Sequence, residues 1–364
     1  MKISEIIEQI EALAPLPLQE SFDNSGLQTG DISQEVKGIL LCIDVTEAVM
    51  DEAVTLGCNL VISHHPLLFK PLRTLTGRNY IERSLIKACK NDIAVYSSHT
   101  SLDNAENGVN YHLAEKIGLK KIRILSPKKD SLLKLVTFVP TAFAEPLRSA
   151  LFKAGAGVIG NYDSCSFNVE GCGTFRAGES ANPFVGAVGE SHSEPEIRLE
   201  TVLPAYRKSA VLRALMTSHP YEEPAFDFYR LDNDWIQAGS GAIGELPEPI
   251  GEADFLQSLK TVFNLQCLKH SPLTGRKISR VALCGGSGAF LIPEAVAAGA
   301  DIFITGEARY NDYYDVENRL LLAVIGHHES EISTKELIYK ALSSKAADFP
   351  IHLSKTDLNP VGYL

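Results

Sequence analysis

Two histidines that directly follow an apolar segment are the first residues suited to chemistry. His64 and His65 come after the segment NLVIS, and Pro66 behind them stops the predicted strand from continuing. Adjacent histidines within a strand point to opposite faces, but at the end of a strand, where the chain turns, both can reach one pocket. Neutral imidazole nitrogens held in this way are typical metal ligands.

Two further histidines precede a carboxylate at one shared spacing. His99 lies four residues before Asp103, and His327 lies four residues before Glu331; both pairs follow predicted strands. A carboxylate can bridge two ions, so these carboxylates, with His327 and the first pair of histidines, suit two cations about 3.5–4 Å apart. The set has no thiolate and therefore favours Zn, Fe, Mn or a similar divalent first-row ion.

The same residues admit other roles. His99 could be a further ligand, could hold a carboxylate ligand in place, or could act as a general acid or base. If no metal binds, His64 and His65 could hydrogen-bond to a turn, while His327 and His328 could cap a helix. Five of the ten histidines lie in these three places, which favours the metal hypothesis over separate structural roles.

A repeat indicates which elements position these side chains. Residues Leu41–Ser63 and Leu283–Thr305 align without a gap. Each copy is predicted to be an apolar strand, a helix that ends at a glycine (Gly57 or Gly299) and a second apolar strand, which is a βαβ unit with parallel strands. Sites in α/β sheets of this kind lie outside the carboxyl ends of the strands, where the paired histidines fall.

Between the two halves lies a segment of different character, residues 129–234. Its predicted order is strand, helix, strand, strand, helix, strand, which is that of a ferredoxin-like α+β module. The simplest organisation is one α/β domain, made of residues 1–128 and 235–364 and interrupted by this insert. The elements expected in the insert are strands at 133–139, 164–170, 197–203 and 225–231, and helices at 144–154 and 205–217.

Three other motifs have structural explanations beside functional ones. The stretch Gly285–Gly288 could hold a phosphate at a helix start or form a tight turn, and it lacks the lysine of a P-loop. The stretch Asp23–Leu27 is typical of turn chemistry, although it could also border the pocket. HPYEEP (219–224) is expected to be a packed connection between a strand and a helix; with Cys165 and Cys172 it could instead form a second metal site.

Composition limits the class of protein. The chain of 364 residues is 45% hydrophobic and 22% charged, and its net charge of −11 disfavours non-specific nucleic-acid binding. No apolar run approaches the ~20 residues that a membrane span needs. The seven cysteines are odd in number and contain no C-x-x-C pair, which indicates reduced thiols and a cytoplasmic protein.

Several motifs together resemble one family. The motifs SHHP, HTSLDNAENG, TGEARY and GHHESE, with FDNSGLQTG near the start, are similar to those of the GTP cyclohydrolase 1 type 2 homolog family, also called NIF-three-like or dinuclear-metal-centre proteins. The central segment, with GNYDSCSF and HPYEEP, resembles the CutA-like or PII-like insert of the longer bacterial members. Members often have a histidine after the tyrosine of TGEARY, whereas this chain has Asn311, which puts proton transfer at that position in doubt.

The resemblance implies a two-metal centre in each protomer and a toroidal homohexamer whose openings are capped by the inserts. Position by position, it implies that the ligands are His64, His65, Asp103, His327 and Glu331.

The expected function is that of a metal-dependent hydrolase acting on a phosphoester or nucleotide, with His99 as a candidate acid or base, because two cations suit a small anionic substrate. The alternative is a non-enzymatic ring that binds a protein, a nucleic acid or a regulatory ligand, with the metals in a structural or sensing role.

Overall fold

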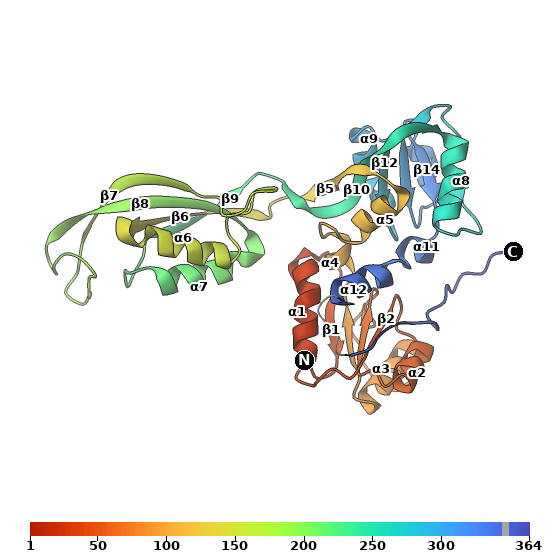
Figure 1. The fold of residues 1–364 in the computed structure, drawn as a ribbon, viewed down its shortest axis with the longest axis horizontal. Coiled ribbons are helices and arrows are strands. Elements are labelled where there is room, and N and C mark those ends of the chain that lie inside the picture. The colour runs from red at the N-terminus through yellow and green to blue at the C-terminus, as the bar shows by residue number, and fades with distance from the viewer. Residues whose placement is uncertain (344–348) are drawn as a thin grey trace. The chain divides into compact units, whose positions relative to one another are not determined.

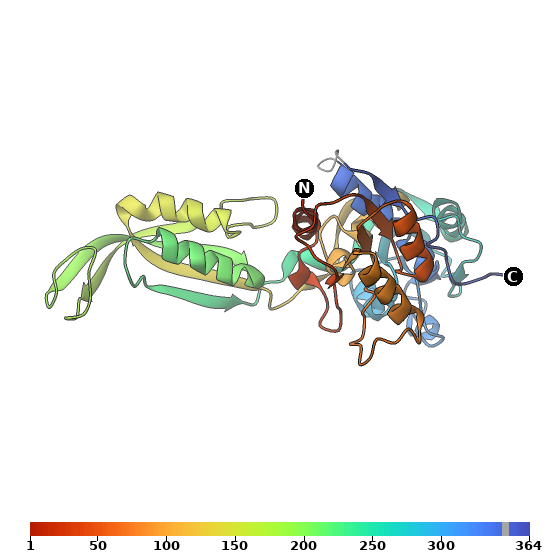
Figure 2. The same cartoon turned by 90° about the horizontal axis from the view of Figure 1, so that it is seen from below.

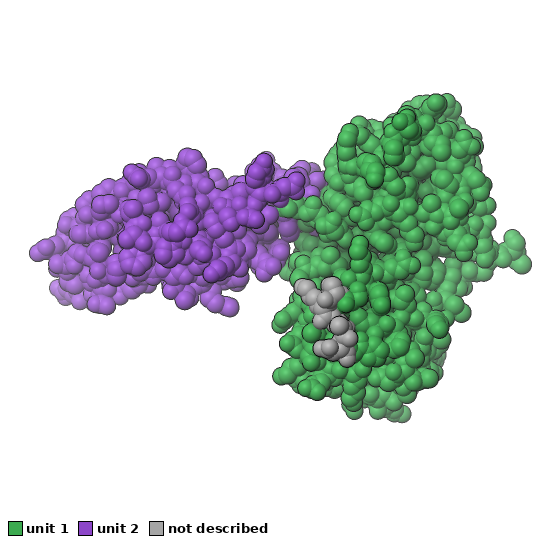
Figure 3. Space-filling view, in the orientation of Figure 1, with its two compact units in different colours: residues 1–126, 237–364 green, residues 127–236 purple. Residues whose placement is uncertain are grey.

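The computed structural model describes residues 1–343 and 349–364, and these form two compact units (Figure 3). The first unit consists of residues 1–126 and 237–364, and the second of residues 127–236. Among the described residues, no helix combines the length and the apolar character needed to cross a membrane.

The first sheet of the first unit is mostly parallel and carries helices on both faces (Figures 1 and 2). Four of its strands are parallel neighbours, and one edge strand is antiparallel. Because both faces are covered, every residue of its central strands is buried, so these strands are continuous apolar runs. Its strands in spatial order are β1 (Gly26–Thr29), β4 (Ala94–Ser97), β3 (Leu60–Ser63), β2 (Ile39–Cys42) and β15 (Ile351–Leu353), and its helices are α1 (Ile3–Leu13) with α12 (Thr334–Ser343), and α2 (Glu47–Thr55) with α3 (Tyr80–Lys90).

The second sheet of this unit contains the other copy of the repeat. Its three central strands are parallel, and antiparallel strands flank them. In spatial order the strands are β11 (Lys269–His270), β14 (Leu321–Val324), β13 (Ile302–Thr305), β12 (Lys277–Cys284), β10 (Trp235–Gly251) and β5 (Lys120–Lys128), and the helices near them are α5 (Val109–Ile117), α8 (Glu252–Val262), α9 (Ile292–Ala297) and α10 (Asp312–Asp315).

The two βαβ units predicted from the repeat are confirmed, down to the strand register. Each copy forms one parallel strand pair, and equivalent residues are paired in the two copies. The residues that follow β3 and β13 therefore lie at equivalent edges of the two sheets. The register is Leu41 opposite Ile62 and Cys42 opposite Ser63 in the first sheet, and Leu283 opposite Ile304 and Cys284 opposite Thr305 in the second.

Helices α2 and α9 also end in the same way, at the glycines expected from the sequence. Gly57 and Gly299 adopt φ of +70° and +68°, a left-handed conformation that glycine takes without steric cost. Two backbone bonds then close each helix as a Schellman motif. These bonds run from Gly57 N to Val54 O and Cys58 N to Ala53 O, and from Gly299 N to Val296 O and Ala300 N to Ala295 O.

The second unit is one antiparallel sheet with two helices on one face (Figures 1 and 2). Its core lies between the sheet and the two helices, and consists mainly of leucines and valines from the sheet and from both helices. In chain order its elements are β6 (Leu132–Pro140), α6 (Ala144–Lys153), β7 (Phe167–Arg176), β8 (Ser191–Pro204), α7 (Lys208–Ser218) and β9 (Phe226–Leu231), and the spatial order of strands is β7, β8, β6, β9.

Two strands of this unit differ from the sequence expectation. Strand β7 begins three residues later and ends six residues later than the expected segment 164–170, and β8 begins six residues before residue 197. Most residues of β7 and half of residues 191–196 are exposed. Glycines at 171 and 173 and a proline at 195 also interrupt the apolar alternation that would indicate a strand.

Candidate metal centre

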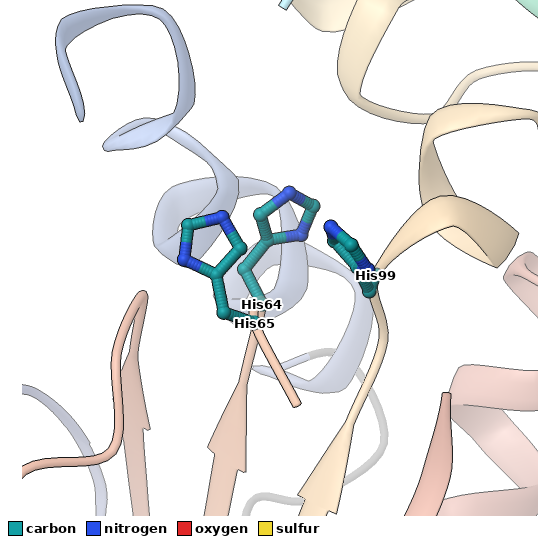
Figure 4. Close-up of side chains that lie close together, drawn as sticks. All are labelled: His64, His65 and His99. Carbon is teal, nitrogen blue, oxygen red and sulfur yellow. The ribbon is translucent and has the colours of Figure 1, made fainter. Parts of the chain in front are cut away.

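Three of the candidate histidines lie at the carboxyl ends of neighbouring strands of the first sheet (Figure 4). His64 and His65 follow β3, and His99 follows β4, which pairs with β3 in parallel. Their ring centroids are 5.1 to 5.4 Å apart. The turn after β3 thus brings both adjacent histidines to one place, as the position of Pro66 predicts.

Two short helices add the carboxylates. Helix α4 (Thr100–Asp103) follows His99 and ends at Asp103, and α11 (His327–Glu331) follows β14 of the second sheet. In α11 the spacing of four residues places His327 and Glu331 on the same face. The six residues singled out in the sequence therefore meet between the carboxyl edges of the two sheets.

The carboxylate of Glu331 lies at the middle of the group. Its Oε1 is 3.7 Å from His64 Nε2, and its Oε2 is 3.0 Å from His65 Nε2 and 3.1 Å from His327 Nε2. Asp103 Oδ1 also lies 3.7 Å from His64 Nε2. His64 and Glu331 are almost fully buried, and the other members are partly exposed.

Each of the four histidines is held at Nδ1 by an oxygen acceptor, so that Nε2 is the atom directed into the group. A bond of this kind fixes the ring and places the proton on Nδ1, leaving the Nε2 lone pair free. The acceptors are Ser98 O for His64 (2.9 Å), Asp44 Oδ1 for His65 (2.9 Å), Asp23 Oδ1 for His99 (2.7 Å) and Glu307 Oε1 for His327 (3.0 Å).

This arrangement fits a cation. With the protons on Nδ1, the Nε2 atoms of His65 and His327 are two acceptors only 3.3 Å apart, and Glu331 Oε2 is a third. Within the described residues, the buried atoms His64 Nε2 and Glu331 Oε2 have no hydrogen-bond partner. Buried acceptors that face one another cost free energy unless a positive charge lies between them. Two sets of side chains are close enough to hold an ion: His64, His65 and His99, and His65, His327 and Glu331.

The electrostatics of the group agree with that conclusion. Burial alone would raise the pKa of Glu331, but the neighbouring imidazoles of His327, His64 and His65 hold it well below its usual range. Burial likewise opposes the charged form of His65, but Asp44 and Glu331 raise its pKa to about 10. Burial raises the pKa of Asp103. The carboxylates around the histidines therefore favour a positive charge at this place, and a metal cation bound to the Nε2 atoms of neutral imidazoles would supply it.

The family model described as Duf34/NIF3 (NGG1p interacting factor 3) matches residues 1–360. The chain belongs to the DUF34/NIF3 family. Two relatives named GTP cyclohydrolase 1 type 2 homolog, from Halalkalibacterium halodurans and Bacillus subtilis, are each 36% identical to it over 99% of this chain and 98% of theirs.

Solved structures show the same similarity across the whole chain. The crystal structure of a Bacillus cereus protein related to NIF3 has a TM-score of 0.86 and 36% identity, covering 100% of this chain and 99% of that one. A Staphylococcus aureus protein has a TM-score of 0.79 and 30% identity over the same shares of the two chains.

Three carboxylates that orient histidines in this DUF34/NIF3 member were not predicted as site residues. Asp44 and Glu307 each come two residues after a buried strand, at the same sheet edges as the histidines, and that position is the signal that could have found them. For Asp23 the sequence favours turn chemistry and also allows a position at the border of the pocket. Its carboxylate instead accepts bonds from His99 Nδ1, from Ser25 Oγ and from the backbone and hydroxyl of Thr100.

The glycine-rich stretch 285–288 is a tight turn rather than a phosphate cradle. Three of its N–H groups already have protein acceptors, namely Asn110 Oδ1 for Gly285, Ser330 Oγ for Gly286 and Thr305 Oγ1 for Gly288. A Cβ at Gly286 would overlap Glu331 Oε1. This glycine therefore allows the turn to pass directly beside the central carboxylate.

The remaining motifs do not join the site. HPYEEP connects a helix to a strand, α7 to β9, and not a strand to a helix as expected. Within the described residues, no third group of side chains suited to a metal includes it, Cys165 or Cys172. Asn311 is exposed and begins α10.

A cavity of about 330 Å³ opens beside the site. His65 and His327 form part of its wall, and Lys269 on β11 and Tyr363 near the chain end form other parts. Lys269 is exposed and makes no ion pair with any residue that the structure describes. Its ammonium group is therefore available to an anion bound next to the histidines.

Proposed function

We propose that this DUF34/NIF3 member is a metal-dependent hydrolase that holds two divalent first-row cations, Zn, Fe or Mn, and acts on a phosphoester or nucleotide. The observation that carries the proposal is the position of Glu331 between two sets of donors, one oxygen near His64 and the other near His65 and His327. Under this proposal His64, His99 and Asp103 hold one ion, His65 and His327 hold the other, and Glu331 contributes to both.

When bound, such a pair supplies Lewis acidity and positive charge for an anionic substrate. The chain's own residues supply orientation. Asp44, Asp23 and Glu307 keep the proton on Nδ1 of their histidines, so Nε2 stays available as a ligand. Because all three are carboxylates, they also raise the basicity of the imidazoles, which makes Nε2 a stronger metal ligand.

The cavity beside the histidines supports the proposed substrate class. Lys269 adds a positive charge to the lining of this space of about 330 Å³, which suits a phosphate group with a small organic substituent.

The proposal is tested by the metal content per protomer, measured by plasma mass spectrometry on protein purified without chelator or nickel affinity. About two ions per chain are expected for the native protein, and E331Q should lose both. Glu336, an exposed glutamate on α12, provides the control E336Q, which should keep them. Reconstituted protein is then assayed with bis(4-nitrophenyl) phosphate and a nucleotide panel.

Three outcomes separate the possibilities. Two ions with hydrolysis that E331Q abolishes support the proposal. Two ions without hydrolysis of any of these substrates contradict the enzymatic part and leave a metal-binding protein with a structural or sensing site. Metal that cannot be restored by loading Zn, Mn or Fe contradicts the proposal altogether.

The family resemblance also motivates two proposals about organisation. The chain would assemble into a toroidal homohexamer, and residues 129–234 would be a ferredoxin-like, CutA/PII-like insert of that ring. Sedimentation analysis of the full chain tests the first proposal, since a monomer or dimer at micromolar concentration contradicts it.

A further inference from the structure

The second unit contains a cavity of its own, of about 640 Å³. This volume falls in the range of small-molecule sites, about 300–1,000 Å³. Its walls are β7, the start of β8 and the HPYEEP connection, and its apolar side chains include Phe138, Phe175, Phe184 and Tyr221. The cavity lies entirely within residues 138–225, so it is independent of the metal centre.

One carboxylate in this cavity belongs to a largely buried glutamate and, in the part of the chain that the structure describes, accepts a hydrogen bond at only one of its two oxygens. Glu196 is 7% exposed, and its Oε1 accepts a hydrogen bond of 2.8 Å from the hydroxyl of Tyr221. Burial and the Glu196 carboxylate raise the pKa of Tyr221, so the hydroxyl stays protonated and donates. Within the described residues, Glu196 Oε2 has no donor. A carboxylate oxygen of a largely buried glutamate that lines a cavity is a site for a ligand's N–H group.

The backbone is adapted to this carboxylate. Gly173 on β7 lies under Glu196, and a Cβ at that position would overlap Glu196 Oε2. The neighbouring aromatic rings lie close together: the centroids of Phe175 and Tyr221 are 6.1 Å apart, and those of Phe184 and Tyr221 are 6.2 Å apart. A planar ligand whose edge reached Glu196 would therefore contact ring surfaces.

The charges of the cavity select a cation over an anion. Its two arginines are already engaged, because Arg198 Nε donates to Glu200 Oε1 (2.9 Å) and Arg176 Nε donates to Gly189 O (2.7 Å). Four glutamates line the same cavity, which leaves an excess of negative charge. A carboxylate beside aromatic rings is the combination that binds planar cations, through charge-assisted hydrogen bonds and cation–π contacts.

We propose that this cavity is a binding site for a planar aromatic ligand that carries an amidine-type edge, with two N–H groups directed at the Glu196 carboxylate. The motif HPYEEP then has a role in binding, since Tyr221 orients the carboxylate.

The test uses the full-length protein and three isosteric probes that differ in charge: benzamidine, benzamide and benzoate. Calorimetry and saturation-transfer NMR should show binding of benzamidine, about tenfold or more weaker binding of benzamide, and no binding of benzoate. E196Q keeps the shape and the acceptor for Tyr221 but removes the charge, and should weaken benzamidine binding about tenfold or more.

Two further variants make the result specific. G173A should also abolish benzamidine binding, because its Cβ displaces the carboxylate, while E190Q, which removes an exposed glutamate outside the cavity wall, should bind like the native chain. Unchanged melting temperatures of the variants establish that they fold. No benzamidine binding to the native chain, equal binding by E196Q and E190Q, or preferential binding of benzoate would each overturn the proposal.

Discussion

His99 Nδ1 lies 2.7 Å from Oδ1 of Asp23, a buried carboxylate 76 positions earlier in the chain. Asp23 accepts four other bonds, from the backbone N–H groups of Asn24 and Thr100 and from the hydroxyls of Ser25 and Thr100, so its position is fixed independently of His99. The histidine ring is therefore oriented by a preformed anchor.

Replacing that anchor should weaken metal binding without removing a ligand. In D23N the amide can no longer accept as a charged partner, so we expect metal affinity to fall by about 10–100-fold. Competition with a chromophoric chelator measures the affinity. The control is D51N, which removes an exposed carboxylate paired with Lys87. Equal affinities of D23N and D51N would show that His99 does not contribute to metal binding.

Lys269 should act on substrate binding rather than on the chemical step. In K269A we expect KM for bis(4-nitrophenyl) phosphate to rise about tenfold, because one charge-assisted hydrogen bond is lost, with kcat changed by less than about twofold. Steady-state kinetics on metal-loaded protein measure both parameters. The variant K277A serves as control, because Lys277 is an exposed lysine at the amino-terminal end of β12 and does not line the cavity. A fall in kcat at constant KM would contradict this role.

The site could be predicted from the sequence where spacing and strand ends coincide. His64 and His65 are adjacent after an apolar run, and His327 and Glu331 are one helical turn apart, so a local pattern sufficed. Asp44 and Glu307 also follow strands, but a single acidic residue after a strand is common, and no spacing distinguishes it. Asp23 reaches the site only because the loop before β1 packs against the end of β4, a tertiary contact that no local pattern reports.

The fold shows the same division. The parallel strands β2, β3 and β13 are buried along their whole length, and β12 is buried over its last four residues, so the apolar composition of these segments predicted them. The exposed half of the β7–β8 hairpin has no such constraint and was misplaced. The cavity of the second unit depends on that hairpin, and for this reason no local sequence pattern predicts it.

A buried ion pair should stabilise the segment that supports His65. Asp357 lies 3.2 Å from Lys335 Nζ and accepts bonds from the backbone N–H groups of Ile43 and Asp44, next to the carboxylate that orients His65. In D357N the ammonium group stays buried without its counter-charge, and we expect a loss of about 3 kcal/mol in the free energy of unfolding of the first unit.

Urea unfolding followed by far-UV circular dichroism measures that loss. The exposed pair of Lys87 and Asp51 provides the comparison, because D51N should cost less than about 1 kcal/mol. If D357N costs no more than D51N, the pair does not stabilise the fold.

The stability of the second unit should depend on pH through His219. Its Nε2 donates to Phe138 O (2.9 Å), and its Nδ1 accepts from the backbone N–H of Tyr221 (3.1 Å). Only the neutral ring makes both bonds, and burial lowers the pKa of His219 below the ordinary value of 6.5, although Phe138 O and Glu196 oppose this. Between that lowered pKa and 6.5 the unfolded chain binds a proton that the folded chain does not. The free energy of unfolding should therefore be constant at high pH and fall as the pH drops below about 6.5.

The single tryptophan, Trp235, lies in the second unit, so its fluorescence reports unfolding of that unit during urea titrations at pH 8, 7, 6 and 5.5. In H219Q the glutamine can make both hydrogen bonds without titrating, so the decrease in stability between pH 7 and 5.5 should be smaller than in the native chain. The control is H192Q, because His192 lies in the same unit and is paired with Glu194. In H192Q the decrease in stability that depends on His219 should be the same as in the native chain. If H219Q and the native chain lose stability in parallel, His219 is not the group that makes the second unit sensitive to acid.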